Sequence, residues 1–301
     1  MSLNRRTFMK TGALTMLPMF GSLTDLLADE SKRQYKVGIC DWSLPGYMAN
    51  PKQFEVAKRL GFQGVQLAYT LAGEFSLHNK ENCSLFSVAA KEQNMEIASL
   101  AAVFFNERPF AREADAELWV SDCLDVMQIL QVKQVLLAFF SNGELKDKPD
   151  DQKATIEKLK RLAPKAEKLG KILAVESYLN AEEHLRIIDA VGSDAVKIYY
   201  DMQNMLNKGY DVYEDMLQLG KRKLISQVHL KDDKGRLETN NIDWPKVKKT
   251  LEKIDYVDWL IVEGAVSGNW EESQMANAAY VRKLFQIAAS TVNIDKRLSM
   301  F

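Results

Sequence analysis

The sequence predicts a single α/β domain, a (β/α)8 or TIM barrel, on three observations. The chain has 301 residues, and one barrel of about 250 residues would use nearly all of them. From Tyr35 onward, eight short runs rich in Val, Ile, Leu, Phe and Tyr alternate with helical patterns, as repeated strand–helix units do. No change in composition marks a second domain after Tyr35.

The eight predicted strands are mostly continuous apolar runs, which is typical of parallel strands that are covered on both faces. We place them at residues 35–40, 64–69, 96–105, 134–140, 172–177, 196–200, 225–230 and 259–262. A doubly wound open sheet is the alternative architecture. Its glycine-rich G-x-G-x-x-G turn is absent from the sequence, so the closed barrel is favoured.

Helical periodicity fills the segments between these strands. Residues 53–60 form one such pattern, and residues 154–169 carry an apolar stripe that stops at Gly170, a typical helix end. Pro245 precedes residues 246–253, where a proline near the start of a helix costs little because that N–H has no partner in any case.

Charge and cysteine content exclude several classes of protein. Lys and Arg total 40 against 41 Asp and Glu, and a chain without net positive charge is a poor ligand for nucleic acid. Cys40, Cys83 and Cys123 are odd in number and far apart, which indicates neither a disulfide framework nor a cysteine zinc site.

Residues 1–30 are expected to be an export signal, which leaves residues 31–301 for the barrel domain. Arg5 and Arg6, followed by Thr7, Phe8, Met9 and Lys10, resemble a twin-arginine motif. The apolar run at 11–27 is too short and too polar to span a membrane stably. We therefore expect an exported, periplasmic protein without stable membrane insertion after processing; a chance arginine pair on an ordinary helix is the alternative.

Four consecutive strands end in a polar, metal-ligating residue: Glu176, Asp201, His229 and Glu263. In a barrel these four ends lie side by side at the C-terminal face, where catalytic residues belong. A buried charge there costs several kcal/mol unless it is paired or binds a cation. Three carboxylates and one imidazole suit one divalent ion such as Mn²⁺, Mg²⁺, Co²⁺ or Zn²⁺. The alternative is four ordinary strand-end residues, each with its own salt-bridge partner.

Motifs in the second half of the chain resemble the sugar phosphate isomerase/epimerase family of xylose-isomerase-like barrels, which includes ketose 3-epimerases and hydroxypyruvate isomerases. The resemblance extends over about residues 35–287. It rests on Val175-Glu176, Tyr200-Asp201-Met202-Gln203-Asn204, Val228-His229-Leu230-Lys231-Asp232 and Val262-Glu263.

The resemblance implies that Glu176, Asp201, His229 and Glu263 hold one catalytic metal. It also implies that Glu176 and Glu263 exchange protons with a sugar carbon from opposite faces. Glu182 and Asn204 match positions that contact substrate hydroxyls, although ketose epimerases commonly have His at the latter position.

Two further residues are candidates for substrate contact. Lys231 lies one strand alternation beyond His229, where its ammonium would meet a substrate oxygen or simply solvent. Trp42 follows the first strand and would either stack on a sugar ring or pack in the core. By contrast, His78 and His184 lie on polar, helix-like stretches, and we expect both at the surface.

Two relatives of this fold are excluded by counting ligands. Abasic-site endonucleases need three metals, several histidines and a basic groove, whereas this chain has three His in total. Xylose isomerase itself uses two metals and further ligands that are absent from the sequence.

The residues therefore predict a metal-dependent enzyme that removes a proton next to the carbonyl of a small carbohydrate. Isomerisation or epimerisation is the first hypothesis, and elimination or hydration of a 3-keto-glycoside is the second. A non-catalytic, metal-containing sugar-binding protein is the alternative from another class. The sequence leaves open whether the chain forms a homo-oligomer.

Overall fold

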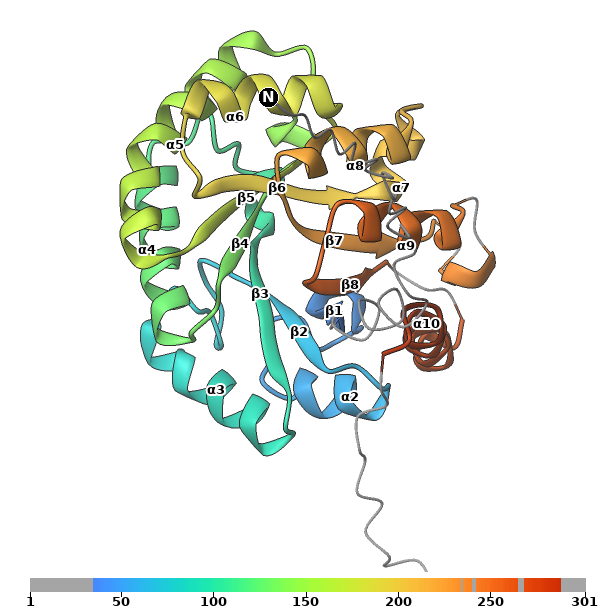
Figure 1. Cartoon of the computed structure of the whole chain (residues 1–301). Coiled ribbons are helices and arrows are strands. Elements are labelled where there is room, and N and C mark those ends of the chain that lie inside the picture. The colour runs from blue at the N-terminus through green and yellow to red at the C-terminus, as the bar shows by residue number, and fades with distance from the viewer. Residues whose placement is uncertain (1–34, 234, 240–241, 265–267, 288–301) are drawn as a thin grey trace, which may run out of the picture. The chain divides into compact units, whose positions relative to one another are not determined.

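Eight parallel strands close into one barrel in the order of the sequence, β1 to β8, in the computed structural model (Figure 1). The structure describes residues 35–233, 235–239, 242–264 and 268–287. Closure is made by β1 and β8, which pair from Lys36 opposite Trp259 to Ile39 opposite Val262. The predicted (β/α)8 fold is confirmed, and the open-sheet alternative is wrong because no strand of this sheet has a free edge.

The strands lie close to the predicted ranges. They are β1 (Lys36–Cys40), β2 (Gly64–Ala68), β3 (Glu96–Ala102), β4 (Gln134–Phe139), β5 (Ile172–Ser177), β6 (Val196–Asp201), β7 (Ile225–Lys231) and β8 (Trp259–Glu263). The third strand is shorter than predicted, because the chain turns at Val103 into a 3₁₀ helix that ends at Asn106.

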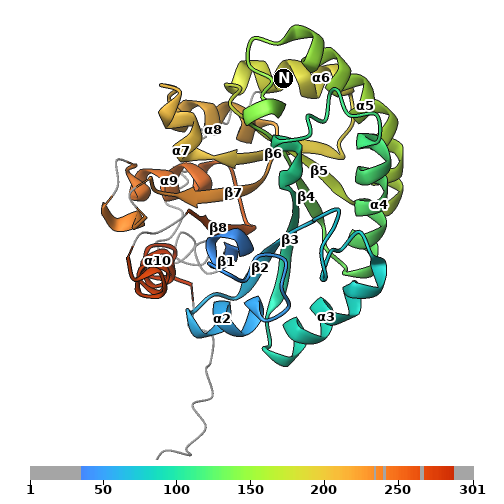
Figure 2. The ribbon, with the colours of Figure 1, turned by 180° about the vertical axis from the view of Figure 1, so that it is seen from behind.

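Helices surround the strands in both views (Figures 1 and 2). Those in the described ranges are α2 (Gln53–Arg59), α3 (Cys83–Glu92), α4 (Ala116–Ile129), α5 (Pro149–Leu169), α6 (Ala181–Val191), α7 (Met202–Asn207), α8 (Val212–Lys221), α9 (Trp244–Lys253) and α10 (Trp270–Phe285). The helix α5 starts at a proline and ends before Gly170, whose φ of 63° is left-handed, as the sequence predicts for a glycine stop.

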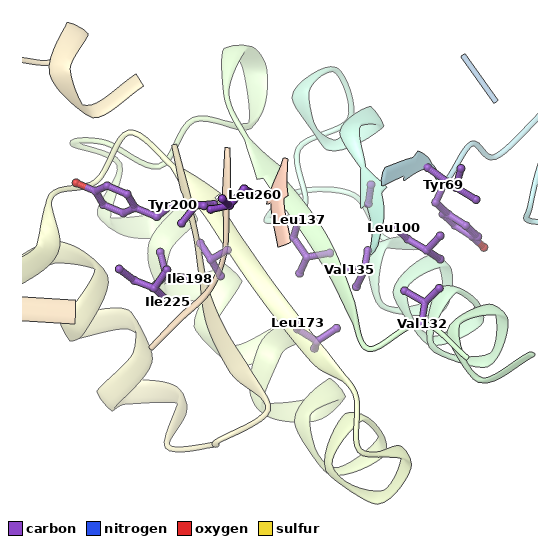
Figure 3. Packing of buried hydrophobic residues seen from close by; sticks show 14 of the residues in the cluster. Tyr69, Leu100, Val132, Val135, Leu137, Leu173, Ile198, Tyr200, Ile225 and Leu260 are labelled. Carbon is purple, nitrogen blue, oxygen red and sulfur yellow. The ribbon is translucent and has the colours of Figure 1, made fainter. Parts of the chain in front are cut away.

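The main hydrophobic core fills the space between the strands and these helices. Figure 3 shows part of it, with Val135 and Leu137 from β4, Leu173 from β5, Ile198 from β6 and Leu260 from β8. All five are completely buried. This layer makes the barrel a rigid scaffold for the side chains at its mouth.

The inside of the barrel is partly polar. Gln66 on β2, Ser99 on β3 and Gln227 on β7 are all completely inaccessible to solvent. The Ser99 hydroxyl donates to Gln227 Oε1 at 2.6 Å, and since β3 and β7 are not neighbours in the sheet, this bond crosses the interior. The polar residues thus form a layer directly beneath the C-terminal face.

Among the described residues, none of the helices has the length and apolar character needed to cross a bilayer. The predicted export signal at residues 1–30 lies outside the described residues.

At the N-terminal end of the barrel, Gly64 on β2 lies very close to the Trp259 side chain on β8, and this contact provides a test of the packing. A Cβ on Gly64 would lie 2.4 Å from Cη2 of Trp259 and 2.9 Å from the backbone oxygen of Glu96. We predict that Gly64→Ala lowers the free energy of unfolding by about 1–3 kcal/mol, because the added methyl has no room. Urea denaturation followed by circular dichroism measures this change.

The double variant Gly64→Ala/Trp259→Leu is the control for that mechanism. If the indole is the obstacle, the double variant loses less stability than the two single changes combined. An unchanged urea midpoint for Gly64→Ala would contradict the close packing.

Candidate functional site

The four predicted ligand residues meet at the C-terminal ends of β5 to β8. Each of Glu176, Asp201, His229 and Glu263 offers one ligand atom, and these atoms all lie within 4.8 Å of one another. Strand register explains the convergence, since Asp201 is opposite His229 and Lys231 is opposite Glu263. The sequence prediction that these strand ends lie together is confirmed.

One imidazole nitrogen faces all three carboxylates. His229 Nδ1 lies 2.8 Å from Glu176 Oε1, 3.4 Å from Glu263 Oε2 and 3.9 Å from Asp201 Oδ2. Glu176, Asp201 and His229 are at most 4% exposed. The cluster therefore brings oxygen and nitrogen ligand atoms close together, and most of it is shielded from solvent.

Burial dominates the electrostatics of this cluster, and repulsion between the carboxylates adds to its effect. Burial raises the pKa of Glu176, against the opposing effect of the His229 charge. Burial also raises the pKa of Asp201 well above its ordinary value, and the neighbouring Glu263 and Glu176 carboxylates add to this while Lys231 opposes it. A carboxylic acid whose pKa is raised in this way keeps its proton at a pH where an ordinary carboxylic acid has lost it, unless further positive charge lies nearby.

Two cationic side chains offset part of the negative charge. Lys231 Nζ lies 3.3 Å from Glu263 Oε2. Although burial alone would raise the pKa of Glu263, the charges of His229 and Lys231 lower it. Burial likewise disfavours a charged His229, but Glu176 and Glu263 raise its pKa. One ammonium and at most one imidazolium still leave three carboxylates undercompensated.

The donor set fits a divalent cation. Asp201 Oδ2 is buried and accepts no hydrogen bond from any described residue, and its nearest cationic nitrogens, on His229 and Lys231, are both 3.9 Å away. A buried carboxylate oxygen without a donor is costly unless an ion occupies the space in front of it. Mixed carboxylate and imidazole ligands suit Mn²⁺, Mg²⁺, Co²⁺ or Zn²⁺.

A cavity of about 320 Å³ opens directly above the cluster, within the size range of about 300–1,000 Å³ that is usual for small-molecule sites. It is lined by Trp42, Met48, Val103, Asn106, Ala138, Phe140, Glu176, Tyr178, Asn204, Lys231 and Glu263. The cavity therefore combines both glutamates of the cluster with aromatic, amide and ammonium groups.

Three of the four predicted substrate-contacting residues line this cavity. The Trp42 indole nitrogen donates to Glu263 Oε1 at 3.0 Å, and the Lys231 ammonium donates to Asn204 Oδ1 at 3.3 Å. Asn204 also donates its backbone N–H to Asp201 Oδ1 at 2.8 Å, as the Asp201 cap of α7. These contacts connect the cavity wall to the carboxylate cluster.

The structure places Glu182 away from the cavity, so its predicted contact with the substrate is corrected. Its side chain is 81% exposed on α6 and pairs with Arg186 one turn later, outside the residues that line the cavity. Between Glu176 and Glu182 the chain leaves β5, turns and enters α6. Glu182 is the second residue of that helix, and its side chain points outward.

Most residues of the cavity wall were not predicted from the sequence. Phe140 and Tyr178 lie against each other with ring centroids 4.7 Å apart, and both line the cavity. Each follows the end of a strand, β4 and β5, so the rule that barrel sites form at strand ends would have found them. Asn106 closes the wall by accepting the backbone N–H of Phe140 at 3.1 Å.

Comparison with known proteins gives a family match over most of the chain. A family model described as a xylose isomerase-like TIM barrel matches residues 54–284. A comparison with curated protein sequences gives no match.

Several solved structures have a similar fold at low sequence identity. A D-psicose 3-epimerase determined in the presence of D-fructose is 16% identical, with a TM-score of 0.68, over 83% of this chain and 99% of that one. The D-psicose 3-epimerase of Clostridium cellulolyticum H10 with D-tagatose is 17% identical, with a TM-score of 0.69, over 83% and 99%. An E. coli 3-keto-D-glucoside 4-epimerase is 16% identical, with a TM-score of 0.67, over 83% and 100%.

The two remaining histidines lie in different environments. The side chain of His78 is 40% exposed, as expected, but His184 is buried, so its predicted surface position is wrong. On α6 it shares a buried face with Ile187, Ile188 and Val191, and its Nε2 lies 2.9 Å from the hydroxyl of Ser177. The helical period of 3.6 residues places 184, 187, 188 and 191 on one face, a stripe that the local polarity of the sequence hides.

Burial of His184 predicts a loss of stability in mild acid. Burial lowers the pKa of His184 from 6.5 to about 4, so between these values the unfolded chain takes up a proton that the folded chain refuses. The free energy of unfolding should therefore fall, by about 2 kcal/mol from this residue between pH 7 and pH 5. Urea denaturation of the wild type and of His184→Gln at both pH values measures this contribution.

His184→Gln should lose correspondingly less stability than the wild type between the two pH values. His78→Gln is the matched control for removing a histidine from the surface. Equal losses in the wild type and in His184→Gln would show that His184 does not carry the effect.

Proposed function

Because this chain belongs to the xylose isomerase-like TIM barrel family, we propose that it is a metal-dependent enzyme that isomerises or epimerises a carbohydrate by moving a proton next to a carbonyl. One observation carries the proposal. Three carboxylates face a single buried histidine nitrogen at the floor of a cavity of about 320 Å³.

Glu176, Asp201, His229 and Glu263 would hold one divalent ion. When bound, such an ion polarises a substrate carbonyl and stabilises the negative charge that develops as the adjacent C–H loses its proton. Its charge would also counter the burial and the carboxylate repulsion that raise the pKa of Asp201 and Glu176, and so keep both carboxylates ionised.

Glu176 and Glu263 are the proposed acid–base pair. Both reach the cavity, and they come from β5 and β8, which are not neighbours in the barrel. They therefore approach a bound substrate from different sides, so that one carboxylate removes a proton and the other returns it. The Trp42 indole and the Lys231 ammonium hold Glu263 by its two oxygens, at 3.0 and 3.3 Å, and orient it toward the cavity.

The cavity wall supports a carbohydrate substrate. Trp42, Phe140 and Tyr178 provide aromatic surface for the C–H faces of a sugar, while Asn106 and Asn204 provide amide groups for its hydroxyls. The similar solved structures include epimerases of a free ketose and of a 3-keto-glucoside, and both substrate types carry a carbonyl next to a C–H bond. Asn204, where ketose epimerases commonly have His, makes the 3-keto-glycoside the more informative one to test.

We further propose export through the twin-arginine route, on the motif around Arg5 and Arg6. Replacing both arginines with lysine should leave the protein in the cytoplasm, because this route requires the arginine pair. Immunoblotting of periplasmic and cytoplasmic fractions measures the distribution. Equal periplasmic amounts of wild type and Arg5→Lys/Arg6→Lys would contradict the proposal.

Deuterium exchange tests the proposed chemistry. In deuterated water with Mn²⁺, the wild type should place deuterium on a carbon of a free ketose or of a 3-keto-disaccharide, measured by NMR and mass spectrometry. Glu176→Gln and Glu263→Gln should each slow incorporation by about 10²–10⁴-fold, because each removes a proton-transfer group. Removing the metal with EDTA should abolish incorporation, and adding Mn²⁺ should restore it.

Glu182→Gln is the matched control, since this exposed glutamate lies outside the cavity and the change should leave the rate unaltered. Release of an aglycone in place of simple exchange would indicate elimination. Saturable sugar binding without exchange would indicate a binding protein, and either result would contradict the proposed isomerase or epimerase.

A further inference from the structure

A chain of hydrogen bonds extends from His229 into the interior of the barrel, on the side away from the carboxylates. His229 Nε2 lies 2.8 Å from Gln66 Oε1, and Gln66 Nε2 donates to the Ser99 hydroxyl at 2.9 Å. That hydroxyl donates to Gln227 Oε1 at 2.6 Å. All four residues are completely buried, so these hydrogen bonds form out of contact with solvent.

The order of donors and acceptors orients the Gln66 amide. A hydroxyl has one hydrogen, and Ser99 gives it to Gln227, so Ser99 accepts from Gln66. The NH₂ group of Gln66 therefore faces Ser99, and its carbonyl oxygen faces His229. The Cys40 thiol lies 3.2 Å from the same oxygen, and a second donor there reinforces this orientation.

An amide oxygen can only accept a hydrogen bond, so the proton of the His229 Nε2 atom must point at Gln66. A neutral imidazole has a single N–H, and with that proton on Nε2 the lone pair is on Nδ1. Nδ1 is the nitrogen that faces Glu176, Glu263 and Asp201.

We propose that Gln66 is a positioning residue that keeps the proton of His229 on Nε2 and so reserves the Nδ1 lone pair for the cation. This inference rests on the proposed function, since it concerns the same metal. Histidine ligands of metals generally donate their other N–H to a fixed acceptor, and loss of such an acceptor typically weakens metal binding 10–100-fold. In this chain the acceptor comes from β2, across the barrel from β7.

Packing keeps the imidazole ring in this orientation. The Tyr199 ring lies with its centroid 4.3 Å from that of His229, and the Trp42 ring approaches edge-on at 6.1 Å. These two aromatic rings limit the space in which the imidazole can turn out of line with Gln66. Gln66 therefore meets a fixed nitrogen of the ring.

Gln66→Met tests the proposal, because methionine has similar volume and no comparable acceptor. We expect Zn²⁺ to bind 10–100-fold more weakly than to the wild type, as measured by chelator competition. In ¹⁵N-labelled, Zn²⁺-loaded protein, the Nε2 proton of His229 should resonate downfield and exchange slowly in the wild type. In Gln66→Met it should move upfield and exchange faster.

Two variants separate this role from a merely structural one. Gln66→Glu keeps an acceptor and should retain the downfield Nε2 proton. Gln134→Met replaces another buried glutamine, on β4, whose Oε1 has no hydrogen-bond donor among the described residues, and should change neither the affinity nor the resonance.

The two proposals fail in different ways. A wild-type protein that binds no Zn²⁺ would overturn the proposed function, and with it the ligand role of Nδ1. A wild type that binds Zn²⁺ while Gln66→Met matches it in affinity and in the Nε2 resonance would overturn the role of Gln66 alone.

Discussion

The candidate site depends on one constraint: three carboxylates, of which Glu176 and Asp201 are buried and Glu263 is largely buried, share a single histidine nitrogen. Glu176, Asp201 and Glu263 come from three strands, and His229 from a fourth, so none of them can move away without disturbing the barrel. Burial raises the pKa of Asp201 well above its ordinary value, and the charges of Glu263 and Glu176 add to this while Lys231 opposes it. The divalent cation that we propose would resolve this conflict, and the same positive charge would favour loss of a proton next to a carbonyl.

The closed barrel supplies the rigidity that such a cluster needs. Each ligand sits at the end of a strand that is paired on both sides, with the hydrophobic layer of Figure 3 behind it. Beneath the cluster, Gln66, Ser99 and Gln227 form a polar layer within the otherwise largely apolar filling of the barrel interior. Above it, the cavity wall brings Trp42 and Lys231 onto the two oxygens of Glu263. The polar layer below the cluster thus orients His229, and the cavity wall orients Glu263.

The fold and the four clustered residues were predictable because both leave local marks in the sequence. Apolar runs predict strands, and a charge at the end of four such runs is conspicuous. His184 shows the limit of this reasoning, since the face of a helix on which a residue lies depends on where the helix begins, and this cannot be judged from polarity alone. Glu182, which was expected near the substrate only from the family resemblance, lies on the exposed face of the same helix. The Gln66–Ser99–Gln227 chain leaves no local mark, because its members are far apart in the sequence and meet only when the barrel closes.

The most direct test of a shared cation site is X-ray diffraction at the manganese absorption edge. The crystals would be of the Mn²⁺-loaded protein. We expect one anomalous peak at the floor of the cavity, about 2.0–2.6 Å from His229 Nδ1 and from an oxygen of each of the three carboxylates. A structure with no peak there, or with these side chains turned away from a common point, would contradict the account.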